Sequence, residues 1–517
     1  MFRIGVDVGG TNTDAVVMQR HDVRAVVKVP TTPDVMGGLM QALRQVLEAA
    51  ALAPEQVGLV VIGTTHFTNA VIERRHLAKT AVVRLCLPAN QCLPPMVDWP
   101  EDLRAAVGKH VYQTGGGFNF DGAPIAPLDA AEIVRIGADI RARGIDTIAV
   151  VGVFAPVRDE SERVSARLLG ESCPGAMITC SADIGQLGFL ERESASILNA
   201  SLRSLARRTV DSLEDGVARC GLRCPVFLSQ NDGTLMDAST AARFPVLTFA
   251  SGPTNSMRGA AFLSGQAEAI VLDIGGTTTD IGLLQKGFPR QASTTVDVGG
   301  VRTNFRMPDV FSIGLGGGSL VHEEGDVVRV GPRSVGYELT RLARAFGGET
   351  LTATDIAVAA GRAAIGDPAR VAGIEPGLAR RALENIESQL ALAVDRTRLS
   401  ARPIPLIAVG GGSILMPERL AGLEVIRPPY FGAANAIGAA IAQISGVVDR
   451  IFSLEGLTRE AALAEGEGEA RRQAAAGGAV ESSIVVTERE DVPLAYLKGN
   501  ATRVRVKVVG DLQFEEA

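Results

Sequence analysis

Short apolar segments alternate along the chain with longer segments in which apolar residues recur every three or four positions. The segments FRIGVDV (2–8), VGLVVIG (57–63) and DTIAVVGVF (146–154) are nearly continuous apolar runs. Runs of this length predict strands that are buried on both faces of a sheet. Between them, segments rich in Ala, Leu and Arg, such as 191–219, predict helices. The alternation of the two patterns indicates an α/β protein.

The pattern changes toward the C-terminus. Residues 458–480 are rich in Glu, Ala and Arg and predict an exposed helix. Residues 482–510 alternate between apolar and polar side chains and predict a small sheet. Two earlier segments, 85–100 and 112–122, are rich in Pro or Gly, so we expect a loop insertion and an irregular turn there.

The composition is that of an ordinary globular protein. Of 517 residues, 46% are hydrophobic and 21% are charged, and the formal net charge is -7. The sequence has no cluster of basic residues, so we expect no nucleic acid and no anionic membrane surface as a partner. No apolar run reaches the roughly 18 residues of a membrane span, and the N-terminus lacks the pattern of a secretory signal. We therefore expect a cytoplasmic protein whose six cysteines are buried thiols rather than zinc ligands.

One motif occurs twice. The segments Ile4–Met18 and Ile270–Leu284 align without a gap and share the pattern D-x-G-G-T-x-T-D. Each copy predicts a strand, a tight glycine turn and a second strand. Glycines tolerate positive φ in such a turn and leave backbone N–H groups open to an anion. The Asp at the end of the first strand, Asp7 or Asp273, can hold a hydrated Mg²⁺ ion, because this ion prefers carboxylates and water.

Two such hairpins that face each other would hold the phosphates of one nucleotide from both sides. The alternative is a pair of tight β-hairpins without a ligand. Other phosphate-binding motifs are disfavoured, because neither copy has G-x-G-x-x-G opening a helix and the sequence has no Walker A loop.

The doubled motif resembles the phosphate-1 and phosphate-2 loops of the actin-like ATPase superfamily. The stretch VGGGS (409–413) is similar to the adenosine motif of that superfamily, and the small-residue helix expected over 433–444 is similar to its closing helix. The resemblance implies an α/β fold with two actin-like (ribonuclease H-like) lobes around a cleft for ATP and Mg²⁺. It divides the chain into 1–265, the first lobe with insertions, 266–450, the second lobe with the closing helix, and 451–517, a C-terminal helix and small β tail.

Further motifs are similar to those of the hydantoinase A/5-oxoprolinase family. They are GTTHFTNAVIERRHLAKTAVVR (63–84), ERESASILNASL (191–202), SQNDGTLM (229–236), FPVLTFASGP (244–253) and SIGLGGGSL (312–320). The resemblance implies an ATP-dependent enzyme that opens a cyclic amide, namely a hydantoin, 5-oxoproline or a related lactam. Phosphorylation of the amide carbonyl oxygen would allow water to attack, with catalysis mainly by positioning and charge neutralisation.

The same resemblance leaves other functions open. Members of the family also serve as subunits of ketone carboxylases, so a carboxylase-type activating subunit is an alternative. A non-catalytic nucleotide-binding switch is another. Besides the small cyclic amide, the expected partner is a B-type hydantoinase subunit or another protein, in a homo- or hetero-oligomer.

The resemblance also assigns roles within the repeated motif. Asp7 and Asp273 would bind Mg²⁺, or one of them would orient the attacking group, and Thr11 and Thr277 would act beside them in catalysis. The residues expected to hold phosphates are Gly9, Gly10, Thr11, Asn12 and Thr13 on the first loop and Gly275, Gly276, Thr277 and Thr278 on the second. The residues expected to approach the adenosine are Gly410, Gly411 and Gly412.

Several roles stay open at this point. Asp14 and Asp280 either stabilise the hairpins or take part in the site. Gly316–Gly318 and Ser319 form either a loop of backbone donors for phosphate or lactam, or a structural turn. The segment SGPTNSMRGA (251–260) departs from the glycine-rich loop of relatives, and the chain stops earlier than typical hydantoinase A chains. Both departures concern the identity of the substrate.

A polar segment at a strand-to-helix junction is the expected substrate site. Thr64, Thr65, Thr68 and Asn69 either face the substrate or cap the helix that follows. His66 stands where larger relatives have a small apolar residue, and we favour a substrate contact for it over a surface position.

Overall fold

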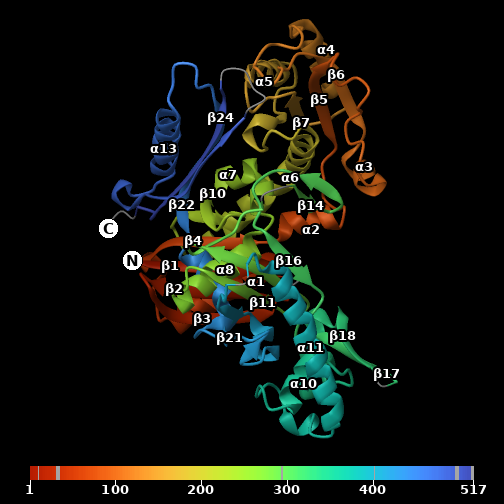
Figure 1. Cartoon of the computed structure of the whole chain (residues 1–517), viewed down its shortest axis with the longest axis vertical. Helices are drawn as coiled ribbons and strands as arrows, with labels where there is room; N and C mark the ends of the chain where they lie inside the picture. Colours follow the sequence, from red (N-terminus) through yellow and green to blue (C-terminus); the bar gives the residue numbers. More distant parts are fainter. Residues whose placement is uncertain are drawn as a thin grey trace.

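The structure is a computed structural model that describes residues 1–9, 11–30, 35–292, 295–325, 327–400, 402–494 and 500–513. Three large sheets organise the chain: one runs through the middle of the molecule, one lies below it and one lies at the top (Figure 1).

The largest sheet has nine strands in the order β23-β24-β22-β10-β9-β4-β1-β2-β3. They are β1 (Phe2–Val8), β2 (Asn12–Gln19), β3 (Asp22–Pro30), β4 (Val57–Thr64), β9 (Val226–Ser229), β10 (Thr234–Asp237), β22 (Gln443–Phe452), β23 (Val485–Pro493) and β24 (Thr502–Gly510). Strands β1 to β3 form an antiparallel meander, and β4 pairs with β1 in parallel.

Strand β1 shows how the alternation of its side chains positions the site. Ile4 and Val6 pack against helix α1 (Val35–Ala49) on one face of the sheet. Gly5 and Asp7 point to the other face, toward helix α12 (Ala434–Ala440). Ile4 and Val6 therefore belong to the core of the first lobe. On the other face, Gly5 allows α12 to pack closely, and Asp7 is hydrogen-bonded to that helix.

The second sheet repeats this arrangement. Its strands are β11 (Ala269–Ile274), β12 (Thr279–Gln285), β13 (Phe288–Pro289), β16 (Val310–Ile313), β19 (Leu406–Val409), β20 (Arg419–Leu420) and β21 (Leu423–Ile426). Strands β11 and β12 form an antiparallel hairpin, and β19 pairs with β11 in parallel. Helix α11 (Pro376–Thr397) covers one face, and helix α8 (Ser251–Ser264) covers the other. The repeat confirms the predicted fold of two actin-like lobes.

Helices α8 and α12 pack against each other between the two sheets. A Cβ atom added to Gly259 would lie 1.9 Å from the carbonyl oxygen of Ala434, and one added to Gly438 would lie 1.8 Å from that of Asn255. Only glycine permits this approach of the two backbones. The helix expected over 433–444 is shorter than predicted, because α12 ends at Ala440 and the chain enters β22 at Gln443.

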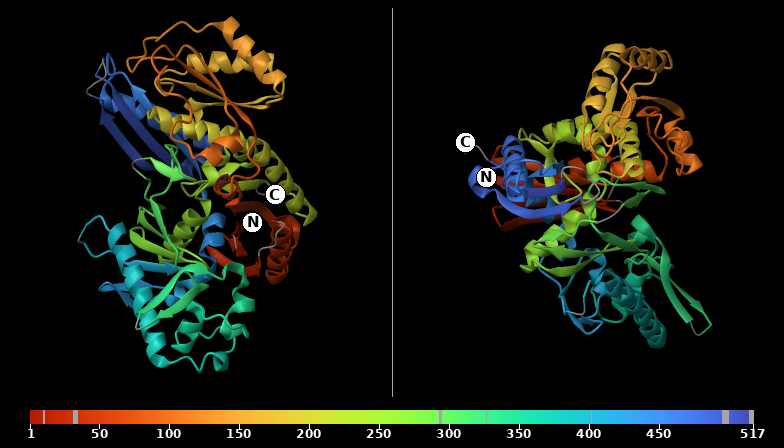
Figure 2. Two further views of the ribbon diagram at one scale, coloured as in Figure 1. Left: turned by 90° about the vertical axis from the view of Figure 1, so that its right-hand side faces the viewer. Right: turned by 45° about the horizontal axis from the view of Figure 1, so that its top comes forward.

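Residues 80–180 form a third unit, which the sequence analysis did not identify. Its four parallel strands are β5 (Thr80–Leu87), β6 (His110–Gly115), β7 (Thr147–Gly152) and β8 (Met177–Cys180), in the order β6-β5-β7-β8. Its helices are α3 (Glu101–Val107), α4 (Ala130–Ala142) and α5 (Glu160–Ser172). This unit lies on the first lobe, on the side away from the second lobe (Figure 2).

Two predictions for this unit need correction. The Pro-rich segment 85–100 is not a simple loop insertion, because its first residues complete β5, and Met96 and Trp99 are buried against the long helix α6 (Phe189–Arg219). The indole N–H of Trp99 donates to the Ser194 hydroxyl at 3.0 Å. The segment 112–122 is irregular only after Gly115, since its first residues belong to β6.

The C-terminal tail also differs from the prediction. Strands β22, β24 and β23 extend the sheet of the first lobe instead of forming a small sheet of their own. Helix α13 (Arg459–Ala476), predicted as exposed, buries one side against this extension. The buried positions are four residues apart and small: Ala462, Gly466, Ala470 and Ala474. Small residues give little apolar signal in a sequence, so the buried side of the helix was not recognised.

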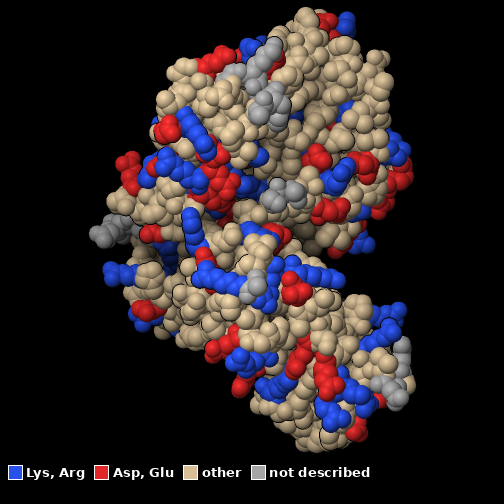
Figure 3. Space-filling model, in the orientation of Figure 1, with Lys and Arg blue, Asp and Glu red and all other residues tan. Residues whose placement is uncertain are grey.

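The remaining described helices and hairpins are short. They are α2 (His66–Ile72), α7 (Ala238–Arg243), α9 (Leu339–Leu342), α10 (Ala353–Ala359), the β14–β15 hairpin (Val296–Val298 and Val301–Thr303) and the β17–β18 hairpin (Ser319–Glu324 and Val327–Ser334). Among the helices that the structure describes, none is both long and apolar enough to cross a membrane. Acidic and basic side chains are interspersed over the face seen in Figure 3.

Candidate nucleotide-binding cleft

The two copies of the repeated motif form hairpins of the same geometry. Asp7 pairs across its hairpin with Asp14, and Asp273 pairs with Asp280. The turns close in the same way, because the Gly9 N–H donates to the Asn12 carbonyl at 3.0 Å and the Gly275 N–H donates to the Thr278 carbonyl at 2.9 Å.

The turns of the two hairpins meet across a cleft between the lobes. A Cβ atom added to Gly276 would lie 3.5 Å from the hydroxyl oxygen of Thr11. A cavity of about 320 Å³ opens at this place. Its walls include these predicted residues: Gly9, Thr11, Asn12, Asp273, Gly275, Gly276, Thr277, Gly317, Gly410, Gly411 and Gly412. The structure thus brings the two hairpins and the glycines after β19 into one site.

Some predicted residues lie elsewhere. Thr13 is fully buried inside its hairpin, and Thr278 is exposed outside the cavity wall. Gly10 lies outside the described residues.

The loop of Gly316, Gly317 and Gly318 supports the second hairpin from behind. The N–H of Gly317 donates to the Gly275 carbonyl at 3.0 Å, and that of Gly318 donates to the Gly276 carbonyl at 2.7 Å. The N–H of Gly316 donates to the Ser319 hydroxyl at 2.9 Å. These three donors are therefore engaged within the protein, which favours the structural alternative for this loop.

Asp7, in the first lobe, is almost fully buried and does not itself line the cavity, whereas its neighbours Asp14 and Asn435 do. The amide of Asn435, on α12, donates to Asp7 Oδ2 at 2.9 Å and to Asp14 Oδ2 at 3.1 Å. Burial, and secondly the negative charge of Asp14, raise the pKa of Asp7 to about 6. Asp14 forms an ion pair with Lys28 on the next strand and also lines the cavity, so both alternatives for this residue stay open.

Asp273 occupies the equivalent place in the second lobe. Burial raises its pKa to about 7, and the charges of Asp280 and Asp7 act in the same direction, while the Ser256 hydroxyl opposes them. The helices α8 and α12 correspond in the same way as the hairpins. Ser256 lies three residues before Gly259 on α8, and Asn435 lies three residues before Gly438 on α12. Each carboxylate thus receives a polar side chain from the helix that packs on its own sheet.

Glycines make room for the two carboxylates on the neighbouring parallel strands. A Cβ atom added to Gly63, at the end of β4, would lie 2.5 Å from Asp7 Oδ1. One added to Gly410, directly after β19, would lie 2.4 Å from Asp273 Oδ1. Gly410 therefore shapes the carboxylate site as well as the cavity wall.

Four residues of the site were missed by the sequence analysis: Lys28, Asn255, Ser256 and Asn435. Lys28 sits in β3 opposite Asp14, and only the strand register reveals that it reaches the cleft. The buried amide of Asn255 lies next to Asp7 and lowers the pKa of that carboxyl, but neither of its polar atoms meets the geometry of a hydrogen bond. The departure from the glycine-rich family pattern in 251–260 was the one signal that pointed to α8.

The predicted substrate segment lies beside Asp7 but does not line the cavity. The Thr64 hydroxyl accepts from the His66 N–H at 3.2 Å, and the Thr68 hydroxyl donates to the Phe249 carbonyl at 2.9 Å. Thr65 is the N-cap residue of α2 but makes no side-chain capping bond, and Asn69 is exposed. His66 is half-buried, and burial lowers its pKa. A role in substrate binding remains a prediction for Thr64, Thr65, His66 and Asn69.

The donor set suits a hydrated Mg²⁺ ion. Asp7 and Asp273 present carboxylates from opposite lobes, and burial, more than neighbouring negative charge, raises their pKa values, so a cation beside them would stabilise the ionised forms. Within the described part of the chain, no group of three or more His, Cys, Asp or Glu side chains is arranged as a metal site. An ion here would depend on water and phosphate oxygens for its other ligands, as Mg²⁺ commonly does.

We expect the free energy of unfolding of the ligand-free protein to fall as the pH rises through about 6 to 7. Asp7 and Asp273 hold their protons more tightly in the folded chain than an ordinary Asp with a pKa near 3.8. Their contribution is complete below that value and is lost as each carboxyl ionises. Urea unfolding at pH 5 and pH 8 measures the change. The double variant Asp7→Asn, Asp273→Asn should show a smaller decrease, and an equal decrease in both proteins would contradict the assignment.

Comparisons with known proteins agree with this geometry. The family model described as "Hydantoinase/oxoprolinase N-terminal region" matches residues 3–173. The model described as "Hydantoinase/oxoprolinase" matches residues 192–367. The caprolactamase subunit alpha of Pseudomonas jessenii is 26% identical over 479 residues, which cover 87% of this chain and 67% of that protein. The acetophenone carboxylase gamma subunit of Aromatoleum aromaticum is 22% identical over 504 residues, which cover 85% of this chain and 68% of that protein.

A solved structure shares the fold. The crystal structure of the ATP-dependent caprolactamase from Pseudomonas jessenii superimposes with a TM-score of 0.80 at 20% identity, over 99% of this chain and 88% of that chain. The match therefore includes both lobes, the unit of residues 80–180 and the C-terminal extension. The chain belongs to the hydantoinase/oxoprolinase family.

Proposed function

We propose that this protein is the ATP-dependent subunit of an enzyme that opens a cyclic amide: a hydantoin, 5-oxoproline or a related lactam. The observation that carries the proposal is the pair of matched hairpins, whose turns meet at one cavity and which carry Asp7 and Asp273 at equivalent positions. Family membership supports an ATP-dependent reaction, and the caprolactamase relative supports a lactam as substrate.

The proposed reaction overcomes the poor reactivity of an amide carbonyl. The bond between the γ-phosphorus and ADP breaks, and a new bond forms from that phosphorus to the carbonyl oxygen. Water then attacks the carbonyl carbon, the ring C–N bond breaks, and phosphate leaves with the former carbonyl oxygen. The sum is lactam, water and ATP to amino acid, ADP and phosphate.

The residues of this chain mainly position and neutralise charge. Asp7 and Asp273 would hold Mg²⁺, which when bound neutralises charge on the phosphates. Thr11, Thr277 and the glycines of the two turns would fix the phosphate chain, and the glycines after β19 would lie against the adenosine. The segment 64–69, next to Asp7, would hold the cyclic amide.

Lys28 provides a more limited test of the same cleft. Its ammonium group lines the cavity beside Asp14, where it would contact a phosphate oxygen. We expect Lys28→Met to raise the KM for ATP about tenfold with little change in kcat, because one charge-assisted hydrogen bond contributes about 1.5 kcal/mol or more. The exposed Lys109→Met is the control. A KM for ATP that does not change in Lys28→Met would place the phosphates elsewhere.

The relatives suggest a partner. The caprolactamase and acetophenone carboxylase proteins are named as subunits alpha and gamma. We infer that this chain also works with a second subunit, of the B type, which would complete the hydrolysis.

The test is phosphate release from Mg-ATP by the purified chain, alone and with candidate partner subunits, against hydantoins, 5-oxoproline and lactams. Stimulation by one ring compound supports the proposal. The carboxylase relative makes a second function worth testing in the same assay, and stimulation by bicarbonate with a ketone would favour it. Tight ATP binding without turnover under all these conditions would favour a nucleotide-dependent switch.

A further inference from the structure

A second cavity lies away from the nucleotide cleft and shares no wall residue with it. It has a volume of about 270 Å³ and lies where three parts of the chain meet. Residues 182–187 follow β8, the last strand of the unit of residues 80–180. Residues 230–232 come from the turn between β9 and β10, and residues 447–451 come from β22.

The position is one that α/β proteins use for ligands. Strands β7 and β8 are parallel, and the cavity lies beyond their carboxyl ends, at Pro156 and at residues 182–187. Small molecules bind open α/β sheets on this side. The walls combine apolar side chains such as Ile184, Leu247 and Ile451 with a few polar groups, as in small-molecule sites generally.

Most charged side chains on the walls are already paired. Asp232 forms an ion pair with the buried Lys507 at 2.8 Å, and Asp449 accepts two hydrogen bonds from Arg503 at 2.7 and 2.6 Å. Asp183 pairs with Arg163, and Arg450 pairs with Glu465 and Glu469. A ligand would have to break these contacts in order to use those groups.

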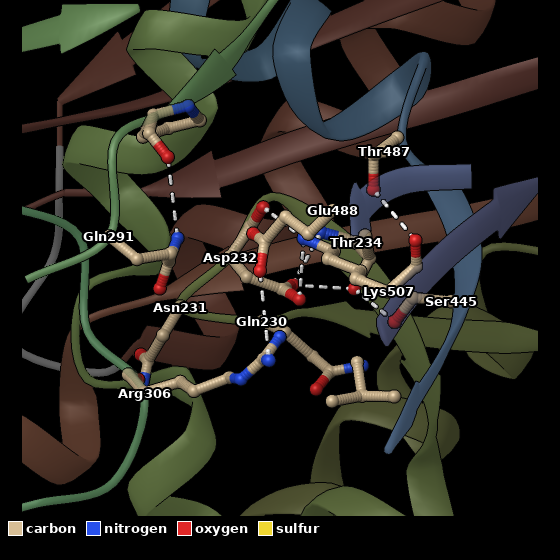
Figure 4. Close-up of polar contacts among 12 residues, drawn as sticks. Gln230, Asn231, Asp232, Thr234, Gln291, Arg306, Ser445, Thr487, Glu488 and Lys507 are labelled. Carbon is tan, nitrogen blue, oxygen red and sulfur yellow. Dashed lines mark hydrogen bonds and ion pairs between the residues drawn. The ribbon is translucent and has the colours of Figure 1, made fainter. Parts of the chain in front are cut away.

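Arg306 differs from them. Its terminal nitrogens Nη1 and Nη2 are buried and have no hydrogen-bond partner among the described residues. The nearest carboxylate is Glu488, whose Oε2 lies 3.7 Å from Arg306 Nη2 and 3.4 Å from Arg505 Nε. Figure 4 shows the Arg306 side chain reaching toward Glu488 and Asp232. Two guanidinium groups thus share one carboxylate, while the nearby carboxylates of Asp232 and Asp449 are already paired with Lys507 and Arg503.

A buried guanidinium with two unused donors matches one kind of ligand group. A carboxylate has the charge and the planar shape to accept both N–H groups of Arg306 at once. Because Arg306 has no carboxylate to itself, a ligand with one negative charge suits the site. The apolar side chains of the walls favour a small organic molecule over an inorganic anion. We propose that this cavity binds a small organic carboxylate and that the Arg306 guanidinium turns from Glu488 toward the ligand in order to donate from Nη1 and Nη2.

One residue joins this cavity to the nucleotide cleft. The amide of Asn231 donates to the Arg306 carbonyl at 3.1 Å and accepts from the Ala250 N–H at 2.8 Å, directly before α8. The Thr254 hydroxyl, on α8, donates to the Asn231 carbonyl at 2.9 Å. The same helix presents Asn255 and Ser256 at the cleft, so the two cavities share a structural element.

The carboxylate could belong to a ring substrate or to an acyclic acid, and three related probes distinguish these sources. 5-Oxoproline is a ring that carries a carboxylate, glutamate is its ring-opened form, and 2-pyrrolidinone is the same ring without a carboxylate. Isothermal titration calorimetry of the full chain without ATP measures binding of each probe. Binding of a carboxylate in this cavity is independent of the proposed function, because the calorimetry needs no ATP and no turnover.

We expect 5-oxoproline or glutamate to bind at least tenfold more weakly to Arg306→Gln than to the wild-type protein, and 2-pyrrolidinone, which has no carboxylate, to show no difference between the two proteins. Arg450→Gln is the matched control, since Arg450 lines the same cavity but is paired outward, and binding to it should not change. Arg306→Gln removes a buried charge without a hydrogen bond, so it should fold, and a thermal melt checks this. If neither carboxylate binds the wild-type protein, or if Arg306→Gln binds as tightly, the proposal is wrong.

Discussion

Asp7→Asn is expected to reduce ATP turnover by about 10³-fold while leaving the protein folded. The substitution removes one of two carboxylates that would hold Mg²⁺ and stabilise charge on the transferred phosphoryl group, and losing one such group commonly lowers kcat by about 10² to 10³. The side chain keeps its shape, and its new amide oxygen can still accept from Asn435. Steady-state phosphate release at saturating Mg-ATP and substrate measures the loss.

Stability distinguishes a catalytic loss from unfolding. Because burial raises the pKa of Asp7 to about 6, its ionised form is unfavourable in the empty cleft at pH 8. Asp7→Asn should therefore be at least as stable as the wild-type protein at that pH, although it is inactive. Glu384→Gln, on the exposed side of α11, is the control for the loss of a carboxylate. Full ATP turnover in Asp7→Asn would show that the Asp7 carboxylate is not needed for the reaction.

Gly438→Ala is expected to destabilise the protein by about 3 kcal/mol, the upper end of the roughly 1 to 3 kcal/mol that overpacking of a well-filled core usually costs. The new Cβ atom would lie 1.8 Å from the Asn255 carbonyl oxygen, and only a movement of the α8 or α12 backbone can relieve that contact. The same movement would displace Asn435 and Ser256 from the two carboxylates. Urea unfolding measures the stability, and ATP binding should weaken in parallel.

A second helical glycine provides the matched control. Gly468, in α13, has only the flexible end of Arg472 near the position of an added Cβ atom, at 3.5 Å. Gly468→Ala should stabilise the protein by up to about 1 kcal/mol, because alanine has the higher helix propensity. If both variants shift the unfolding midpoint by the same amount, the close approach of α8 and α12 does not explain the effect.

The features repeated in the sequence were the ones that could be predicted. The shared D-x-G-G-T-x-T-D pattern specifies two hairpins, and the apolar alternation around it specifies their strands. Since each hairpin starts one sheet, the two lobes follow from the repeat. The cleft residues on those turns, such as Gly9 and Gly275, were therefore identified correctly as neighbours.

Contacts between distant segments could not be predicted in this way. Strand β24 alternates like any amphipathic strand, and nothing local indicates that it pairs with β22 to extend the first sheet. Helix α13 buries alanine and glycine, whose pattern resembles that of an exposed helix. The unit of residues 80–180 has ordinary α/β patterns. That its four strands pair with one another, and not with the strands of the first lobe, cannot be read from those patterns.

The missed site residues have the same explanation. Lys28 reaches Asp14 only through the β2–β3 register, and Asn435 reaches Asp7 only because α12 returns to the first lobe. Arg306 lies in a connecting segment without a motif, and the residues around it are far apart in the chain. In each case the chemistry is visible only after the fold brings the groups together.

The most direct test of the proposed function follows one oxygen atom. The enzyme, with its partner subunit if one is needed, is given Mg-ATP and a lactam that it accepts, labelled with ¹⁸O at the ring carbonyl. If the γ-phosphoryl group is transferred to that oxygen, the released phosphate carries one ¹⁸O atom per turnover, as mass spectrometry would show. If the label stays in the carboxylate of the opened ring and the phosphate is unlabelled, the carbonyl oxygen is not phosphorylated and the central claim is wrong.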